Sequence, residues 1–229
     1  MKNKIAIVTG ANGGLGTFVT QSLLDAGVTV VGVSKSIQAS DFKSPLFTAL
    51  PADLSTAAET AKMVETVVAR FARLDVLAHT VGGFAGGTSI AETGDATFQS
   101  MFDLNLKSAF YLLRAVIPAL RKSGNGRIIA IASRAALEPG AGIGAYSASK
   151  AAMVSLIRTV ALENKDAGLT ANVILPGTID TPANRKALPK ADTSKWVQPA
   201  AIASLITWLA ADTAKDVNGA VIPVYGTDL

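Results

Sequence analysis

Short runs of apolar, largely β-branched residues alternate along the chain with longer segments in which apolar residues recur at helical spacing. The apolar runs predict strands over residues 5–8, 29–33, 46–50, 76–79, 127–132, 170–175 and 220–223. The segments between them predict helices over residues 15–26, 57–72, 97–122, 146–165 and 199–210. The strand runs are almost continuously apolar, which is typical of strands that are buried on both faces.

The alternation of strands and helices predicts βαβ units, and therefore the α/β class. We expect a single domain over residues 1–229, in which a doubly wound, mostly parallel, seven-stranded sheet carries helices on both faces. The chain contains no internal repeat, low-complexity segment or linker. Residues 183–197 are the least regular stretch, and their Pro, Lys, Asp and Asn content predicts a loop or short helices over a site, which would form a substrate loop.

Composition excludes several classes of function. The chain has no cysteine and a single histidine, His79, so we predict no metal site. The net charge of +4 is not gathered into a basic run, which argues against nucleic acid as a partner. No apolar run approaches the roughly 20 residues that span a bilayer, so no membrane partner is expected. Met1 leads into the first strand without a signal sequence, and we expect a cytoplasmic protein.

A glycine-rich turn, Thr9 to Gly16, joins the first predicted strand to the first predicted helix. Glycine suits such a turn because it accepts positive φ and lets the backbone approach a ligand closely. The N-terminus of the following helix offers unpaired N–H groups to a pyrophosphate. The turn therefore predicts a Rossmann-type dinucleotide site formed by Gly10, Asn12, Gly13, Gly14, Leu15 and Gly16. The alternative is a tight connection without a ligand, because the spacing differs from the Gly-x-Gly-x-x-Gly pattern.

The end of the second predicted strand indicates which dinucleotide binds. Ser34 and Lys35 stand where a carboxylate commonly reads the adenosine ribose, and both can bind a 2′-phosphate. We therefore expect NADP(H) as the favoured cofactor, with NAD(H) as the alternative if Lys35 is an ordinary solvated charge. Asp53 and Leu54 follow the third strand. Asp53 could bond the adenine amino group or cap the next helix, and Ser55 is an equally good cap.

Tyr146 and Lys150 stand four residues apart on a predicted helix, and Ser133 lies thirteen residues before the tyrosine at a strand end. Residues four apart share a helix face, so both side chains can point into one cleft. A nearby ammonium lowers the pKa of a tyrosine from roughly 10, which would let Tyr146 exchange a proton with a carbonyl or alcohol. Ser133 could hold the substrate oxygen, and Lys150 could also bond the nicotinamide ribose. The alternative for Tyr146 and Lys150 is a surface pair on an amphipathic helix.

Over its whole length the chain resembles the short-chain dehydrogenase/reductase family. The resemblance rests on the glycine turn, Ser133, the Tyr146-x-x-x-Lys150 pair and the Pro176-Gly177 stretch with Thr181. It implies that Asn105 completes the catalytic group through a bound water. The alternative for Asn105 is a buried amide that bonds the backbone, and the two roles are compatible. The resemblance also implies that residues 176–181 lie against the nicotinamide, with contacts from Pro176, Gly177, Ile179 and Thr181. Gly82 is retained after the fourth strand, but His79 and Thr80 replace the family's amides, so the usual support of the sheet is in doubt there.

Residues 81–87 and 175–196 resemble the dihydropteridine reductases, a narrower group within the same superfamily. That likeness implies a similar lid over the substrate, although those reductases have an acid in place of Ser34 and lack the serine at Ser133. Candidate substrate contacts are Phe84, Arg134, Asn184, Arg185 and Trp196. Each could equally be a solvated charge, a core aromatic or a loop cap.

Together these features predict an NADP(H)-dependent oxidoreductase that reduces a carbonyl or imine-like small molecule. Pterin reduction is the alternative within the same class, and reduction of acyl chains on a carrier protein is a third reading. A non-catalytic regulator that senses the dinucleotide is the alternative of another class, although the retained Tyr146 and Lys150 favour chemistry. The resemblance also implies a homodimer or homotetramer formed through the central helix, the tyrosine helix and the last strand.

Overall fold

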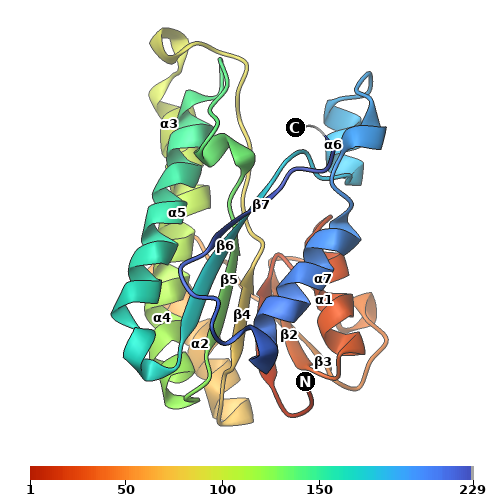
Figure 1. Ribbon diagram of the computed structural model, residues 1–229, viewed down its shortest axis with the longest axis vertical. Helices are drawn as coiled ribbons and strands as arrows, with labels where there is room; N and C mark the ends of the chain where they lie inside the picture. Colours follow the sequence, from red (N-terminus) through yellow and green to blue (C-terminus); the bar gives the residue numbers. More distant parts are fainter. Residues whose placement is uncertain (228–229) are drawn as a thin grey trace.

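The computed structural model describes residues 1–227 and contains a seven-stranded sheet in which every pairing between strands is parallel. The strands lie in the order β3-β2-β1-β4-β5-β6-β7 (Figure 1). The chain thus winds outward from β1 to β3, returns to β4 beside β1, and winds outward again. The strands are β1 (Ile5–Thr9), β2 (Thr29–Ser34), β3 (Phe47–Pro51), β4 (Val76–His79), β5 (Arg127–Ile131), β6 (Thr170–Pro176) and β7 (Val221–Val224).

Helices cover both faces of the sheet, as Figure 1 shows. Helices α1 (Gly16–Asp25) and α7 (Pro199–Ala210) pack on one face, and α2 (Ala57–Phe71), α4 (Ser108–Lys122) and α5 (Gly144–Glu163) pack on the other. Ile7 belongs to the core beneath α2, α4 and α5, whereas its neighbours Ala6 and Val8 belong to the core beneath α1 and α7. Both faces of the strands are therefore buried, and the predicted doubly wound fold is confirmed.

The long helix predicted over residues 97–122 is wrong in one respect. It is divided into α3 (Asp95–Phe102), a π-helical turn (Asp103–Lys107) and α4. The Ser108 N–H reaches back five residues to the Asp103 carbonyl, and the Ser108 hydroxyl donates to the Leu104 carbonyl at 2.7 Å. The hydroxyl thus satisfies a backbone acceptor that the wider turn leaves open. The other predicted strands and helices match the observed limits to within two residues.

The segment between β6 and α7 is only partly regular. It contains the short helix α6 (Pro182–Ala187) and a single 3-10 turn (Thr193–Lys195). Ile179 forms an isolated parallel bridge with Val197, which closes the two ends of the segment against each other. Within residues 1–227, no helix combines the length and the apolar character that crossing a membrane requires.

Candidate active site

The predicted site residues gather at the edge of the sheet where the parallel strands end. The strand order reverses between β1 and β4, and ligands of open α/β sheets bind at such a switch point. Gly10 follows β1, Ser34 ends β2, Ser133 follows β5, and Pro176 ends β6. The topology therefore brings segments distant in sequence to one edge.

The glycine turn is built by close backbone packing. Gly10 has φ of +70°, and its N–H donates to the Val33 carbonyl at 2.7 Å. A Cβ on Gly16 would lie 1.9 Å from the Gly10 carbonyl oxygen, and a Cβ on Gly14 would lie 2.9 Å from the Thr181 side chain. No side chain caps the start of α1 at Leu15. The turn therefore leaves backbone N–H groups accessible to an anion, which fits a pyrophosphate.

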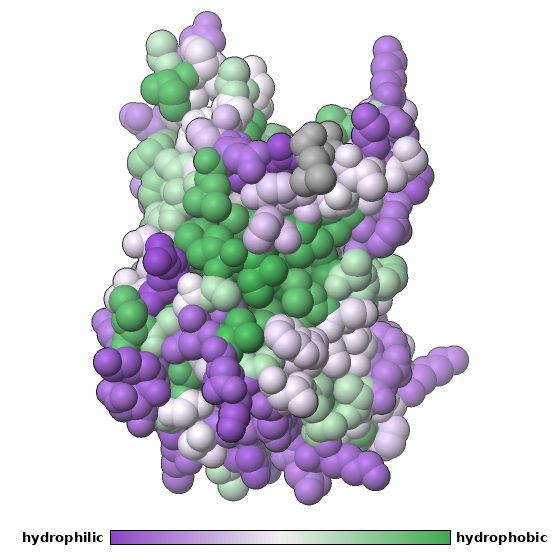
Figure 2. Space-filling view, viewed as in Figure 1, coloured by the Kyte–Doolittle hydropathy of each residue, from purple (hydrophilic) through white to green (hydrophobic). Residues whose placement is uncertain are grey.

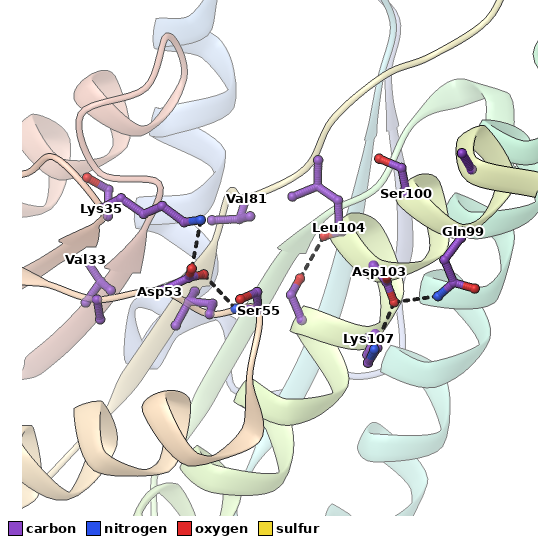
Figure 3. A pocket seen from close by; sticks show the side chains of 15 residues that line it. Val33, Lys35, Asp53, Ser55, Val81, Gln99, Ser100, Asp103, Leu104 and Lys107 are labelled. Atoms are coloured by element: carbon purple, nitrogen blue, oxygen red, sulfur yellow. Dashed lines mark hydrogen bonds and ion pairs between the residues drawn. The ribbon is translucent and has the colours of Figure 1, made fainter.

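A pocket of about 680 Å³ adjoins the ends of β2 and β3 and is closed on its other side by α3 and the π-helical turn (Figure 3). Its size fits the adenosine half of a dinucleotide. Lys35 and Asp53 form an ion pair of 2.8 Å at its wall, with side chains 73% and 41% exposed. A pair this exposed contributes little stability, so either partner can be redirected to a ligand. The predicted cofactor residues that line the pocket are Ser34, Lys35, Asp53 and Leu54.

The prediction that Asp53 or Ser55 caps the helix α2 is wrong. The N-cap of α2 is Thr56, whose side chain accepts from the Glu59 N–H at 3.3 Å, so neither Asp53 nor Ser55 is the cap. Asp53 instead accepts from Lys35 and from the Ser55 N–H at 2.9 Å. These two bonds lower the pKa of Asp53, the Lys35 bond more strongly. Asp53 is thus a carboxylate at the pocket wall, where it can accept a hydrogen bond from a ligand.

The corner near Ser34 also differs from expectation, because a carboxylate is present. Ser34 donates to the Asn12 side-chain oxygen at 2.7 Å, and the Asn12 amide donates to Ser36 at 3.2 Å. The same amide lies 3.4 Å from a carboxylate oxygen of Asp41, a residue of the loop that follows β2. Sequence reasoning missed Asp41 because its place depends on how that loop folds back.

Tyr146 lies in the first turn of α5, beside Ser133 and Phe84. Burial raises the pKa of Tyr146, and a hydrogen bond with the Ser133 side chain opposes that rise. The expected lowering of this pKa by Lys150 is therefore wrong, because burial has the largest effect. The ring of Phe84 meets the ring of Tyr146 edge-on, with centroids 5.0 Å apart, although Phe84 itself is 66% exposed. The phenol is thus packed on one side and hydrogen-bonded at its hydroxyl.

Lys150 is buried on the same helix, 4% exposed. Its ammonium nitrogen donates to the Ile131 carbonyl at 3.3 Å and lies 6.0 Å from the centroid of the Tyr146 ring. A Cβ on Gly82 would lie 2.7 Å from that nitrogen and 3.0 Å from the Asn105 side-chain oxygen. Gly82 therefore leaves the space in which Lys150 and Asn105 come close. Burial lowers the pKa of Lys150 from 10.5 to about 8.

This lowered pKa makes stability depend on pH. Between about pH 8 and 10.5 the unfolded chain binds the Lys150 proton more tightly than the native protein, so the free energy of unfolding rises with pH. We compare the unmodified protein with Lys150→Met. As the pH rises from about 8 to 10.5, the free energy of unfolding of the unmodified protein should increase by roughly 1 kcal/mol per pH unit more than that of the variant. Below about pH 8 the difference between the two proteins should not change with pH. Urea denaturation of both proteins at a series of pH values checks this. A stability difference that stays flat across the window would contradict it.

Asn105 occupies the π-helical turn and is fully buried. Its side-chain oxygen accepts from the Gly83 N–H at 2.9 Å, and its amide donates to the Gly83 carbonyl at 3.1 Å and to Ser149 at 3.0 Å. Asn105 thus fixes the segment after β4 and ties it to α5 next to Lys150. The sequence left a structural and a catalytic role open for this residue, and these contacts show the structural one.

His79 and Thr80 tie β1 to β4, which resolves the doubt about support of the sheet. His79 Nδ1 shares a hydrogen bond of 2.8 Å with the Thr9 hydroxyl, and the Thr80 hydroxyl donates to the Thr9 carbonyl at 2.6 Å. Burial lowers the pKa of His79 to about 3, and the charge of Lys150 acts in the same direction. The imidazole is therefore neutral near pH 7, as a structural histidine would be.

Most predicted substrate contacts are already engaged within the chain. Arg185 forms a two-pronged ion pair with Asp180, at 2.6 and 2.9 Å, and Asn184 donates to the Ile179 carbonyl at 2.8 Å. Arg134 pairs with Glu138 at 2.6 Å and lies over the Tyr225 ring at 4.8 Å. Sequence reasoning missed both partners: the four-residue spacing of Arg134 and Glu138 could have indicated their ion pair, whereas no local signal connects Arg134 with Tyr225.

The remaining predicted residues lie around the segment after β6. Thr181 caps α6 by accepting from the Asn184 N–H at 3.3 Å, and its side chain faces Gly14 of the glycine turn. A Cβ on Gly177 would lie 2.9 Å from the Tyr225 carbonyl. Pro176 is buried, and Trp196 is half-buried after the 3-10 turn. The cofactor contacts predicted for this segment stay predictions, but its approach to Gly14 fits them.

Comparison with known proteins agrees with this arrangement. Residues 4–192 match the family model of the short chain dehydrogenases. The chain is 30% identical to a 2-dehydro-3-deoxy-D-gluconate 5-dehydrogenase of Pseudoalteromonas atlantica, over 99% of this chain and 96% of the relative. It is 29% identical to a D-beta-hydroxybutyrate dehydrogenase of Rhizobium meliloti, over 97% of each chain.

Solved structures show the same fold. A short-chain type dehydrogenase/reductase from Mycobacterium ulcerans superposes with a TM-score of 0.91 at 25% identity, over 99% of this chain and 90% of the other. ElxO with NADP bound superposes with a TM-score of 0.92 at 22% identity, over 99% and 98%. With the glycine turn, Ser133, Tyr146 and Lys150 at one edge of a doubly wound sheet, this chain belongs to the short-chain dehydrogenase family of hydride-transferring oxidoreductases.

Proposed function

We propose that this protein is an NADP(H)-dependent reductase of a carbonyl or imine-like small molecule, with Tyr146 as the proton donor. The observation that carries the proposal is the contact of Tyr146 with Ser133, on a helix that also brings the buried Lys150 to the same edge of the sheet. The glycine turn and the adenosine-sized pocket lie at that edge, so a dinucleotide can reach the tyrosine.

The roles of the side chains follow from their contacts. The nicotinamide dinucleotide supplies the hydride when it is bound. Ser133 orients the substrate oxygen, since its hydroxyl already bonds the Tyr146 phenol. Tyr146 then donates its proton to that oxygen. The Lys150 ammonium, 6.0 Å from the centroid of the Tyr146 ring, would attract the phenolate that results, although burial has the larger effect on the pKa of Tyr146. Lys150 would also bond the nicotinamide ribose. Asn105 holds the segment beside Lys150 and, through a bound water, completes the proton path.

A steady-state panel tests the reaction class. The protein is assayed with neutral ketones, aldehydes and cyclic imines, and with both reduced cofactors. Turnover of at least one compound supports the proposal. Tight binding of the cofactor without turnover of any compound would favour the dinucleotide-sensing regulator instead.

The preference for NADP(H) rests on Lys35, whose exposed ammonium stands at the pocket wall within reach of a phosphate. We expect Lys35→Met to weaken binding of NADP⁺ by about tenfold, because a bond between two charged groups is lost, and to leave NAD⁺ binding nearly unchanged. Calorimetric titration with each cofactor measures this. Lys165→Met, which removes the same charge from the opposite edge of the sheet, serves as control. Equal losses for both cofactors would contradict the role of Lys35.

Pterin reduction remains the second candidate, favoured by the exposed Phe84 ring that lies edge-on to Tyr146 and could cover a flat heterocycle. An assay with quinonoid dihydropterin and both reduced cofactors decides it, since absence of turnover with either removes this substrate. Arg134 and Arg185 form ion pairs with Glu138 and Asp180 of the same chain, so neither arginine is assigned to the substrate.

We also propose that the protein assembles as a homodimer or homotetramer. Figure 2 shows that hydrophobic residues gather on the face over the edge strand β7, whose residues Val221, Ile222 and Val224 are only half-buried. A second apolar groove runs between α4 and α5, lined by Leu106, Phe110, Ala152 and Leu156 among others. Light scattering of the purified protein gives the number of subunits.

We also propose that the protein is cytoplasmic and that its substrates are small molecules.

A further inference from the structure

The corner at the end of β2 holds one cation, Lys35, and two carboxylates, Asp53 and Asp41, and the mechanism above gives Asp41 no role. Lys35 faces Asp53, and Asp41 faces Asn12. Asn12 belongs to the glycine turn and is also bonded to Ser34, the residue expected to meet the adenosine ribose. Asn12 therefore contacts both Asp41 and the residue expected to meet the 2′ position of that ribose, which puts Asp41 close to this position.

Asp41 is held in place although it is exposed. Its carboxylate accepts from the Gln38 N–H at 3.1 Å, and the Gln38 side chain accepts in return from the Asp41 N–H. The residues that flank this turn, Ile37 and Phe42, are only 3% and 6% exposed. The Phe42 ring packs on Phe47 of β3, with centroids 4.7 Å apart. The loop is thus anchored at both ends, so the carboxylate stays near Asn12.

The charges at this corner act differently on the two cofactors. A 2′-phosphate carries roughly two negative charges, so Lys35 attracts it and Asp41 repels it. The attraction is reduced further because Asp53 already neutralises part of the Lys35 charge at 2.8 Å. A ribose 2′-hydroxyl is neutral and can donate a hydrogen bond to a carboxylate. Asp41 therefore favours the unphosphorylated ribose by both effects.

We propose that Asp41 is a residue of the cofactor site that determines cofactor specificity, accepting from the unphosphorylated ribose and weakening binding of the 2′-phosphate. The inference rests on the proposed function only in that a nicotinamide dinucleotide is the ligand. Selectivity is then the difference between the opposing effects of Lys35 and Asp41. It follows that NAD(H) competes with NADP(H) more strongly than Lys35 alone would allow.

The test measures binding, not turnover. The dissociation constants of NADP⁺, NAD⁺, 2′,5′-ADP and AMP are determined by calorimetry for the unmodified protein and for Asp41→Asn. We expect Asp41→Asn to bind NADP⁺ and 2′,5′-ADP about fivefold more tightly, the effect of removing one like charge across a solvated gap. NAD⁺ and AMP bind no more tightly than before. The gain for 2′,5′-ADP shrinks in high salt, since exposed charges are screened.

Two further variants make the result specific. Asp41→Glu keeps the charge and retains the unmodified ratio of the two affinities. Asp166→Asn removes the same charge from an exposed 3-10 turn that precedes β6, at the opposite edge of the sheet. If Asp41→Asn changes the ratio no more than Asp166→Asn does, the assignment of Asp41 is overturned.

The outcomes separate this inference from the function on which it rests. If the unmodified protein favours NAD⁺ and Asp41→Asn binds NADP⁺ more tightly, the role of Asp41 is supported and the proposed preference for NADP(H) is wrong. Binding that responds as expected, without turnover of any carbonyl compound, supports Asp41 and removes the proposed reaction. If the unmodified protein prefers NADP⁺ and Asp41→Asn does not change that preference, only the proposed role of Asp41 is wrong.

Discussion

Replacing Tyr146 by phenylalanine should lower kcat/KM for the carbonyl substrate by on the order of a thousandfold while leaving the fold and the binding of the dinucleotide intact. The ring stays, and with it the edge-on contact with Phe84. Only the hydroxyl that bonds Ser133 is lost. Steady-state kinetics and a fluorescence titration with the cofactor, made on the same preparation, separate the loss of chemistry from a loss of binding.

Tyr111→Phe is the matched control, because it removes the same hydroxyl from a half-buried tyrosine of α4. That variant should keep the full rate. If Tyr146→Phe keeps the full rate as well, another group donates the proton and the proposed role of Tyr146 is wrong. A loss of cofactor binding equal to the loss of rate would instead make Tyr146 a residue that binds the dinucleotide.

Gly16→Ala should have the largest effect on stability. The added Cβ would stand 1.9 Å from the Gly10 carbonyl oxygen and 2.7 Å from the carbonyl carbon, both backbone atoms that cannot rotate away. The glycine turn must open, at a cost of about 3 kcal/mol, the upper part of the range for overpacking. Urea denaturation measures the stability, and dinucleotide binding should be lost together with the shape of the turn.

Gly140→Ala tests whether that cost comes from the close approach. Gly140 lies in an exposed loop, and the nearest atom to its added Cβ is a side-chain carbon of Ile143 at 3.4 Å, an ordinary contact. Its stability should change by less than about 0.5 kcal/mol. If Gly16→Ala is equally mild and still binds the dinucleotide, the packing of the turn is looser than the structure shows.

The features that could be predicted from sequence are those set by local spacing. The glycine turn, the Tyr146 and Lys150 pair and the order of strands and helices all depend on residues close together in the chain, so the pattern alone identified them. The contact of Ser133 with Tyr146 could also be expected, because a strand end and the following helix meet at the same edge of a parallel sheet.

The features that were missed depend on packing between distant segments. Asp41 reaches Asn12 only because Ile37 and Phe42 are buried on either side of its turn. The raised pKa of Tyr146 follows from burial, which the spacing of Tyr146 and Lys150 does not reveal. The contact of Arg134 with the Tyr225 ring likewise joins segments far apart in the chain, whereas the carboxylate partners of Arg134 and Arg185 lie only four and five residues away.

The π-helical turn at Asp103–Lys107 has a consequence for how this chain tolerates changes in length. One extra residue in a helix rotates every later side chain by roughly 100° about the axis. The turn therefore sets the angular phase between Ser100, which lines the pocket at the ends of β2 and β3, and Leu112, which belongs to the core on the sheet. Deleting a single residue there would rotate the apolar side of α4 away from the sheet, which would disturb the core far more than any substitution at the same positions.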